Sequence, residues 1–338
     1  MSSPTKQKFI RKTLVISASL LSLFTYPSLV LSAPPTATQT QSSSESDQEV
    51  IADEKSIYPI AERIIRANGL DEYPWRIKIE EDYDDNAFAR DLNQIIILKG
   101  LLDKVAGDQA AIAFIIGHEI AHHTQLHTYN LTAFEEKLAK RLQAEADTEV
   151  QNLIATETKK FHAYQNTNRR RKSLCKKEDN AQNTSLASSE YRVLNCQGKP
   201  DADKLELIKQ EILTEKREQL ESAVKKLSRQ QELEADKFGY MYMVRAGYDP
   251  KGALRIFNLM ARGPYVDDNN SSHPSFMERI SAVKELMKKY PASNLADEGA
   301  IRLRQNPTPL TFDVSRDGES LRINSRFSSQ PNSSQTDN

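Results

Sequence analysis

The histidines of this chain are concentrated in one short apolar segment. The sequence has 338 residues and six histidines, and four of the six fall within residues 117–127, which read GHEIAHHTQLH. The surrounding segment, residues 110–127, is apolar on several sides, which predicts a helix in a core rather than on a surface. A buried helix that carries several imidazoles must supply polar partners for them. This requirement constrains the fold more than any other feature of the sequence.

Two of these histidines have the spacing of a metal site. His118 and His122 project from one side of the predicted helix, one turn apart, and Glu119 lies beside them. Two such imidazoles can bind one zinc ion, and the carboxylate can deprotonate a water molecule on that ion. The pattern is typical of zinc hydrolases, although a packed histidine pair without metal has the same spacing. His123 and His127 lie off this side, where we expect them to support the ligands or to be solvated.

A later segment, ELEAD at residues 232–236, offers a third ligand. Glu232 and Asp236 are four residues apart on a predicted helix and therefore share one side of it. One carboxylate can complete a tetrahedral zinc site, and the other can accept the free N–H of a ligating histidine. A solvated acidic helix face is the alternative. The apolar residues that follow, at 238–244, favour a buried helix and therefore ligation.

The last histidine, His273, follows a polar loop and precedes the predicted helix that carries Arg279. Two interpretations stay open for it. It is an exposed loop histidine, or it folds over the metal, where it can stabilise an oxyanion or occupy an open coordination position.

The remaining pattern predicts an α+β domain that is mostly helical with a small β-sheet. Strands are expected at residues 75–79, 86–89 and 93–98. Helices are expected at residues 55–67, from 99, and at 110–127, 134–161, 203–245, 250–262 and 275–289. Beyond them, residues 293–338 form a polar tail in which Asp317-Gly318 indicates a short hairpin.

The N-terminus has the organisation of a secretory signal peptide. Four basic residues precede the apolar run at 14–24, and small residues follow up to Ala33. We therefore expect cleavage of residues 1–33 and export to the periplasm or another extracytoplasmic compartment, with an uncleaved membrane anchor as the alternative. Residues 34–50 are rich in Pro, Ser, Thr and Gln and predict a disordered linker. The formal net charge of −1 does not indicate a nucleic-acid partner.

The two cysteines of the chain, Cys175 and Cys196, lie in a charged helical insertion at about residues 156–205. In an exported protein such a pair most often forms a disulfide, and two free thiols are the alternative. The insertion also carries a run of basic residues between Lys159 and Lys177. We favour a solvated loop for this run over a patch that contacts a membrane surface or an acidic partner. The oligomeric state is not predicted.

Four motifs in order resemble those of the gluzincin metallopeptidases of family forty-eight. They are GHEIAH at 117–122, ELEAD at 232–236, AGYDP at 246–250 and HPSFMERI at 273–280, and DNAFA at 85–89 matches an upstream pattern. The resemblance covers about residues 55–290. The chain departs from HtpX and the prenyl proteases in lacking multiple membrane spans, and from BepA-like periplasmic proteases in lacking helical repeats. Its separation between His122 and Glu232 is also unusually long.

The resemblance implies a zincin fold over residues 51–292 and one zinc ion bound by His118, His122 and Glu232. It also implies that Glu119 is the general base and that Asp236 orients a ligand. Two further roles follow from the resemblance: Arg279 pairs with an acid near the site, and His273 acts at the catalytic centre, where it can hold the enzyme latent.

The resemblance also implies a place for substrate. The strand formed by Asn86, Ala87, Phe88 and Ala89 is expected to be the edge on which a polypeptide adds a strand. The combined expectation is an exported zinc endopeptidase that acts on misfolded or misassembled envelope proteins. A chaperone-like or adaptor-like protein with a latent or structural zinc site is the main alternative, and a zinc hydrolase of non-peptide bonds is another.

Overall fold

The structure is a computed structural model that describes residues 57–90, 92–167, 193–194, 198–262 and 271–328. The predicted signal peptide (1–33), the predicted linker (34–50) and both cysteines, Cys175 and Cys196, lie outside the described residues, so these remain predictions. The described residues divide into two compact units. One unit contains the residues up to Thr128 and from Arg229 onward, and the other is Tyr129–Ser228.

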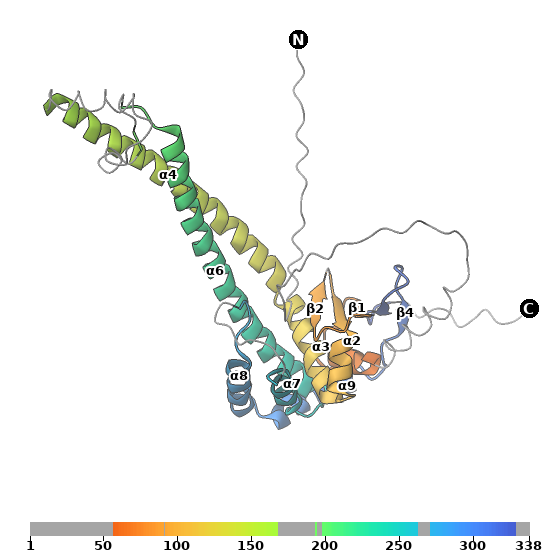
Figure 1. Ribbon diagram of the computed structural model, residues 1–338. Coiled ribbons are helices and arrows are strands. Elements are labelled where there is room, and N and C mark those ends of the chain that lie inside the picture. The colour runs from red at the N-terminus through yellow and green to blue at the C-terminus, as the bar shows by residue number, and fades with distance from the viewer. Residues whose placement is uncertain (1–56, 91, 168–192, 195–197, 263–270, 329–338) are drawn as a thin grey trace, which may run out of the picture. The chain divides into compact units, whose positions relative to one another are not determined.

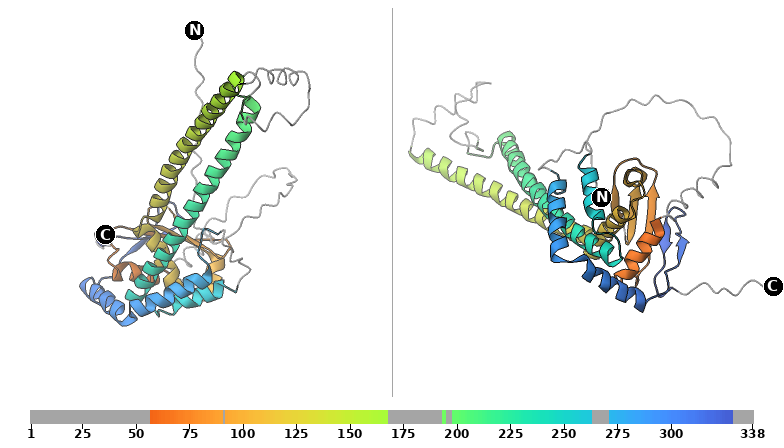
Figure 2. Two further views of the ribbon diagram at one scale, coloured as in Figure 1. Left: turned by 90° about the vertical axis from the view of Figure 1, so that its left-hand side faces the viewer. Right: turned by 90° about the horizontal axis from the view of Figure 1, so that it is seen from below.

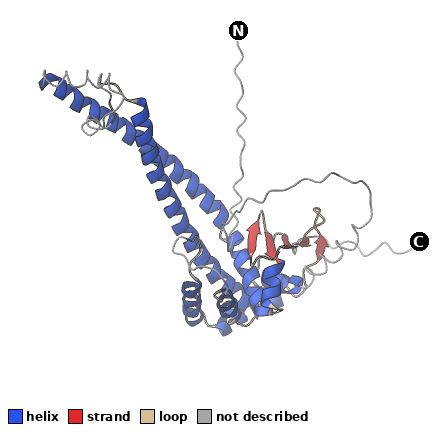
Figure 3. Ribbon diagram, in the orientation of Figure 1, coloured by secondary structure: helices blue, strands red, loops and turns tan. Residues whose placement is uncertain are grey.

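The first unit is built on a five-stranded sheet with the strand order β2-β3-β1-β5-β4, drawn in red in Figure 3. The strands are β1 Trp75–Glu80, β2 Ala87–Arg90, β3 Gln94–Leu98, β4 Phe312–Val314 and β5 Leu321–Ile323. β1 alternates buried and half-buried residues, whereas all five residues of β3 are buried. β1 and β3 are parallel, and the other neighbouring strands are antiparallel. The three strands predicted in the N-terminal half are therefore confirmed.

The C-terminal segment differs from the predicted polar tail. The hairpin forms, and β5 pairs with β1 through Trp75 and Ile323, so the hairpin completes the main sheet. A helix that the sequence did not predict, α9 Ala292–Gln305, precedes it. Gly299 of α9 lies against the backbone of Arg245, close enough that a Cβ atom at this position would collide with it. This segment therefore belongs to the first unit.

The helices of the two units follow the predicted order (Figure 1). A helix covers residues 57–67, and Gly69 beyond it has φ 66°, as a glycine that ends a helix often does. The others are α2 Lys99–Val105, α3 Gln109–Thr124, α4 His127–Thr167, α6 Ala202–Arg245, α7 Gly252–Met260 and α8 Phe276–Lys289. Within the described part of the chain, no helix is both long enough and apolar enough to cross a bilayer.

Helix α3 is the buried core helix that the sequence predicted. Every residue from Ala110 to His122 is buried, and the helix contacts β2, β3 and α7. It ends at Thr124, earlier than predicted, because Leu126 adopts a left-handed backbone conformation with φ 56° and α4 begins at His127. Because of this break, the ring of His127 lies next to the ring of His122 on α3.

The second unit is a helical pair with its own core. The part of α4 after Thr128 and the part of α6 before Arg229 run alongside each other in the left view of Figure 2, and Lys216 of α6 pairs with Glu149 of α4. Their apolar cluster consists of Ala146, Val150, Phe161, Val193, Leu194, Ile208 and Ile212. The predicted insertion at about 156–205 lies within this unit, whose limits are Tyr129 and Ser228.

Candidate metal centre

Three side chains from two helices converge in the first unit. His118 and His122 come from α3 and Glu232 comes from α6, and all three are buried. One donor atom from each residue lies within 4.8 Å of the other two. The Nε2 atoms of the two histidines are 3.1 Å apart, and each is 3.4 Å from one oxygen of the Glu232 carboxylate. In the described residues this is the one group with the composition and spacing of a metal site.

Two glycines allow the helices to approach this closely. Gly117 precedes the first ligand on α3, and Gly239 lies seven residues, or two turns, after Glu232 on α6. A Cβ atom on Gly239 would lie 2.9 Å from the backbone nitrogen of His118, and one on Gly117 would lie 2.9 Å from the carbonyl oxygen of Gly239. The absence of both side chains therefore sets the separation between the helix that carries the histidines and the helix that carries the carboxylate.

A carboxylate orients the first imidazole. The Nδ1 atom of His118 is 3.0 Å from Oδ1 of Asp236, so its N–H donates to the carboxylate, and Nε2 is the ring nitrogen on the side of Glu232. Asp236 is itself held by Arg279, whose Nε and one terminal nitrogen lie 2.8 and 2.6 Å from its two oxygens. Such a two-pronged pair fixes both position and angle.

A third histidine orients the second imidazole. Nδ1 of His122 is 3.2 Å from Nδ1 of His127, and Nε2 of His127 is 3.4 Å from Oε2 of Glu234. His127 is only 3% exposed, so the solvated alternative predicted for it is wrong. His123 takes no part in the centre, since its Nε2 atom bonds the carbonyl of Gln94 at 2.9 Å.

The donor set fits a zinc ion. Imidazole nitrogens and a carboxylate oxygen are ligands that zinc accepts, and each sits about 2.0–2.2 Å from the ion in known sites. Two ligand nitrogens on one tetrahedral ion are then roughly 3.3 Å apart. The observed 3.1 Å between the two Nε2 atoms agrees with that value. Both Nδ1 atoms already have partners, so both Nε2 atoms are left to bind the metal.

The local electrostatics favour the forms that bind metal at two of the three ligands. Burial lowers the pKa of His122 to about 3, which keeps this imidazole neutral. Burial opposes ionisation of Glu232, but His273 and His118 outweigh it and hold the pKa of this carboxyl well below its ordinary value. Burial also opposes a charge on His118, yet its bonds to Asp236 and Glu232 raise its pKa to about 10. A metal ion bound at Nε2 of His118 would take the place of the proton on that nitrogen.

Glu119 has the properties of a general base. It is 4% exposed, and burial raises the pKa of its carboxyl to about 7. A base with a pKa near neutral both accepts and releases a proton readily at physiological pH. Its Oε2 atom has no hydrogen-bond partner among the described residues. One oxygen is thus left facing the pocket that Glu119 lines with His118.

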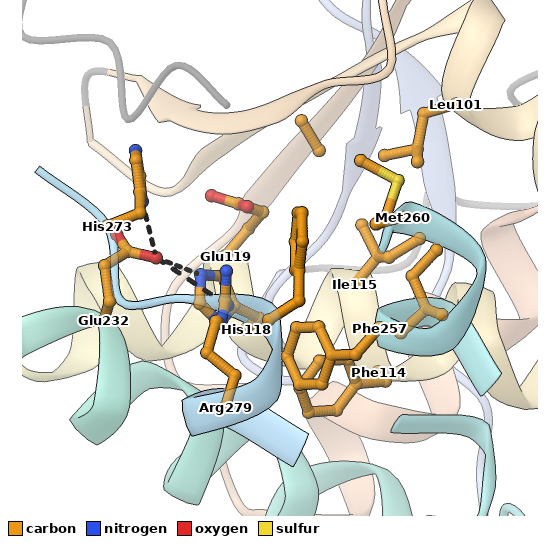
Figure 4. Close-up of a pocket in the computed structure, with 13 residues that line it drawn as sticks. Leu101, Phe114, Ile115, His118, Glu119, Glu232, Phe257, Met260, His273 and Arg279 are labelled. Carbon is orange, nitrogen blue, oxygen red and sulfur yellow. Dashed lines mark hydrogen bonds and ion pairs between the residues drawn. The ribbon is translucent and has the colours of Figure 1, made fainter. Parts of the chain in front are cut away.

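His273 and Arg279 both lie at the centre. Nδ1 of His273 is 3.2 Å from Oε2 of Glu232, which excludes the exposed-loop interpretation of this histidine (Figure 4). Arg279 is 3% exposed, and its terminal nitrogen is 3.7 Å from the same oxygen of Glu232. Both residues come from the HPSFMERI segment, so this segment closes one side of the centre.

The predicted substrate segment lies at one edge of the sheet. Ala87 and Ala89 belong to β2, the terminal strand, and Asn86 directly precedes it. Ala87 lines the same pocket as Glu119, which places this strand beside the centre. Phe88 belongs to a different apolar cluster, with Ile96 and Leu98.

The sequence did not identify Glu234 or the glycine pair. Glu234 lies among other acids in a charged helix, and its contact with His127 depends on the break at Leu126. The glycines had a weak signal, because a glycine inside a predicted helix indicates either a packing contact or a lower helix propensity.

A buried helix with His-Glu-x-x-His, a carboxylate from a later helix and an adjacent edge strand define a zincin-like metallopeptidase fold and site. The model of peptidase family M48 matches residues 52–287, well over half of the chain, and the chain belongs to this family. The resemblance found in the sequence motifs is confirmed. No curated protein and no solved structure matches the chain.

Proposed function

We propose that the protein is a zinc-dependent endopeptidase that hydrolyses peptide bonds. The observation that carries this proposal is the convergence of His118, His122 and Glu232 within 4.8 Å, with Glu119 beside them. Membership of peptidase family M48 supports the same conclusion, because a peptidase acts on polypeptides.

The chemistry divides between the ion and the chain. When bound, zinc supplies Lewis acidity, which acidifies a water molecule and polarises the carbonyl of the substrate. Glu119 accepts the proton of the attacking water and then passes it to the nitrogen of the leaving amine. Asp236 and Arg279 keep the imidazole of His118 in one tautomer and one orientation. The edge strand β2 holds the substrate backbone by adding it to the sheet as a further strand.

We further propose that the protein works outside the cytoplasm, on misfolded or misassembled envelope proteins. The basic, apolar and small-residue regions of residues 1–33 support export. Recognition through the backbone supports a broad range of unfolded substrates, because strand addition reads the main chain rather than a particular side chain.

Replacement of Glu119 tests the mechanism. The Glu119→Gln variant keeps the size of the side chain but removes the base, so we expect cleavage of a casein-type substrate to fall by about a hundredfold or more. Zinc content measured on the same preparation should stay at one ion per chain, because Glu119 is not a ligand. Undiminished cleavage by this variant would refute the role assigned to Glu119.

The contact between His273 and Glu232 favours a second candidate. A histidine 3.2 Å from a ligand carboxylate can keep the centre closed, in a protein whose main work is binding rather than cleavage. The His273→Ala variant separates the cases in an assay with the same substrate. Cleavage rises if His273 holds a protease latent, falls if His273 stabilises the oxyanion, and stays absent if the protein is a binding scaffold.

A further inference from the structure

A groove lies in the second unit, between α4 and α6, the two helices that run alongside each other in the left view of Figure 2. Its volume is about 560 Å³. On α4 it is lined by Phe134, Lys137, Leu138, Arg141 and Leu142. The candidate metal centre uses none of these residues, so the groove is a separate feature of the molecule.

The floor of the groove is apolar and recessed. Leu138 and Leu142 are buried, yet they are not members of the apolar cluster of this unit. Across the groove α6 contributes Ala223, which is small, and Gln219, which is polar. Farther along the pair, α6 contributes isoleucines to the apolar cluster instead. Phe134 extends the floor toward solvent and is 36% exposed.

The rim on α4 is cationic. Lys137 and Arg141 are four residues apart and therefore lie on the same side of this helix, where both are exposed. Among the described residues Lys137 has no acidic partner. Arg141 pairs with Glu145 at 3.3 Å, but both side chains of this pair are largely exposed. Such a pair contributes little, so Arg141 stays available to another carboxylate.

The rim on α6 does not offset this charge. Gln219 is neutral, and its amide donates to Glu215 at 3.2 Å. Glu215 and Glu218 line an adjoining hollow, together with Lys226, and neither acid is among the described residues that line the groove itself. The groove therefore combines an apolar floor with a net positive charge along one side.

The size of the groove suits several side chains of one ligand. An apolar cavity of about 150 Å³ holds a benzene ring, so 560 Å³ gives room for about three side chains of that size. An amphipathic helix presents such a set along one face, at positions i, i+3 or i+4, and i+7. A third helix laid between α4 and α6 would pack on them as helices do in bundles.

We propose that the groove binds an amphipathic helical segment of a partner polypeptide. Its aliphatic side chains lie on the floor formed by Leu138 and Leu142, and its carboxylates pair with Lys137 and Arg141. This inference goes beyond the proposed peptidase function, because it assigns a binding site in the other unit and does not require cleavage.

Two other occupants suit the groove less well. A bilayer surface is contacted by apolar side chains that protrude, whereas Leu138 and Leu142 are recessed between two helices. A second copy of the chain would set one hollow against the same hollow of its partner, which leaves both floors without a filling side chain. A helix from another polypeptide has neither difficulty.

Peptide binding tests the proposal. The full-length, zinc-loaded Glu119→Gln variant is used, so that bound peptide is not cut. Three fluorescent peptides of about 20 residues are compared by anisotropy. One has leucines on one helical face and glutamates beside them, the second has lysines in place of the glutamates, and the third has the composition of the first in an order that is not amphipathic.

At low salt the acidic peptide should bind about tenfold more tightly than the lysine peptide, and high salt should reduce the difference. The third peptide should bind about tenfold more weakly than the first, because it cannot place several leucines on the floor at once. Equal affinities for the acidic and lysine peptides overturn the role of the rim. Equal affinities for the first and third peptides overturn the helical ligand.

A reversal of charge connects binding to this groove. The double variant Lys137→Glu/Arg141→Glu should bind the lysine peptide more tightly than the acidic one, a reversal that misfolding cannot produce. The matched control is Lys140→Glu/Lys159→Glu, which changes two exposed cations of α4 that do not line the groove and should keep the wild-type order. Ala223→Leu fills part of the groove and should weaken the acidic peptide. An unchanged order of affinities in the charge-reversed variant overturns the proposal.

The other occupants are tested on the same protein. Sedimentation with phosphatidylglycerol vesicles detects lipid binding, and light scattering measures the oligomeric state. Vesicle binding that the acidic peptide displaces would assign the groove to lipid, and a dimer that this peptide dissociates would assign it to a second copy. Either result overturns the proposal, whereas a monomer that binds the acidic peptide and not the vesicles supports it.

Discussion

Each ligand histidine of the metal centre has its own partner at Nδ1. His118 is oriented by Asp236, which is bonded in turn to Arg279, and both of these charged side chains are buried. His122 is oriented by His127, whose far nitrogen faces the half-exposed carboxylate of Glu234. If His122 donates to His127, then His127 in turn donates to Glu234, and both rings have a defined tautomer. His127 and Glu234 thus orient His122 in the same way that Asp236 and Arg279 orient His118.

We predict that His127→Ala weakens metal binding. Loss of the imidazole leaves Nδ1 of His122 without its partner, and loss of such a contact typically lowers metal affinity by about 10–100-fold. Competition with a zinc-binding dye measures the change. His162→Ala is the control, since His162 is an exposed histidine of α4 in the other unit. Equal affinities for both variants would show that His127 has no part in holding His122.

At the scale of secondary-structure elements, α3 is stabilised at its start as well as along its buried length. Asp108 is its N-cap and accepts hydrogen bonds from the backbone N–H groups of Ala110 and Ala111. The same carboxylate pairs with Arg255 of α7, whose Nε is 2.5 Å from Oδ2. The first turn of the helix that carries His118 and His122 is therefore tied to α7, which lines the pocket beside Glu119.

We predict that the ionic part of this link is lost in acid. The hydrogen bond from Arg255 lowers the pKa of Asp108 by more than burial raises it, so this pKa lies below the ordinary value. A carboxyl with a lowered pKa in the folded state stabilises the fold above its unfolded pKa, and that contribution disappears as the pH falls through the folded pKa. Asp108→Asn keeps the cap but not the charge, so it should lower stability by up to about 1 kcal/mol at pH 7 and by less at pH 3.

Denaturant unfolding at the two pH values measures this difference. Asp108→Ala is the matched comparison, because it removes the cap as well and should cost about 1 kcal/mol more at pH 7. A difference between the wild type and Asp108→Asn that does not change with pH would contradict the ionic account.

At the scale of the whole molecule, the two units have separate cores. The main core and the cluster beside β2 draw their residues from the first unit, and the helical pair has its own cluster. The chain leaves the first unit after Thr128 and re-enters it at Arg229. Within the first unit these two positions lie close together, because the side chain of Gln231 donates to the carbonyl of His127 at 3.1 Å. The candidate metal centre and the pocket beside it use residues of the first unit alone.

We predict that the first unit keeps its metal without the second. A chain in which a Gly/Ser linker of about six residues replaces residues 129–228 should fold, because its core and sheet are intact. It should bind one zinc ion and cut short peptides at a rate within about threefold of the full chain. Zinc analysis and a peptide assay measure both. An aggregated or metal-free product would show that the helical pair is needed for the fold of the first unit.

The sequence alone determined the elements whose pattern is local. The alternation of β1, the apolar length of α3 and the four-residue spacing of both ligand segments follow from side-chain periodicity, which does not depend on the rest of the chain. The family also followed from ordered motifs, because they name the donors and their chemistry.

Only the tertiary structure decided how distant segments meet. α9 was missed because its sequence is polar and contains Gly299, which is unfavourable in an isolated helix but is required where α9 meets the backbone of Arg245. The contact of His127 with His122 depends on the turn at Leu126, and the separation of α3 from α6 depends on Gly117 and Gly239. Periodicity specifies which side of an element is buried, whereas the partner of that side depends on packing between elements that lie far apart in the sequence.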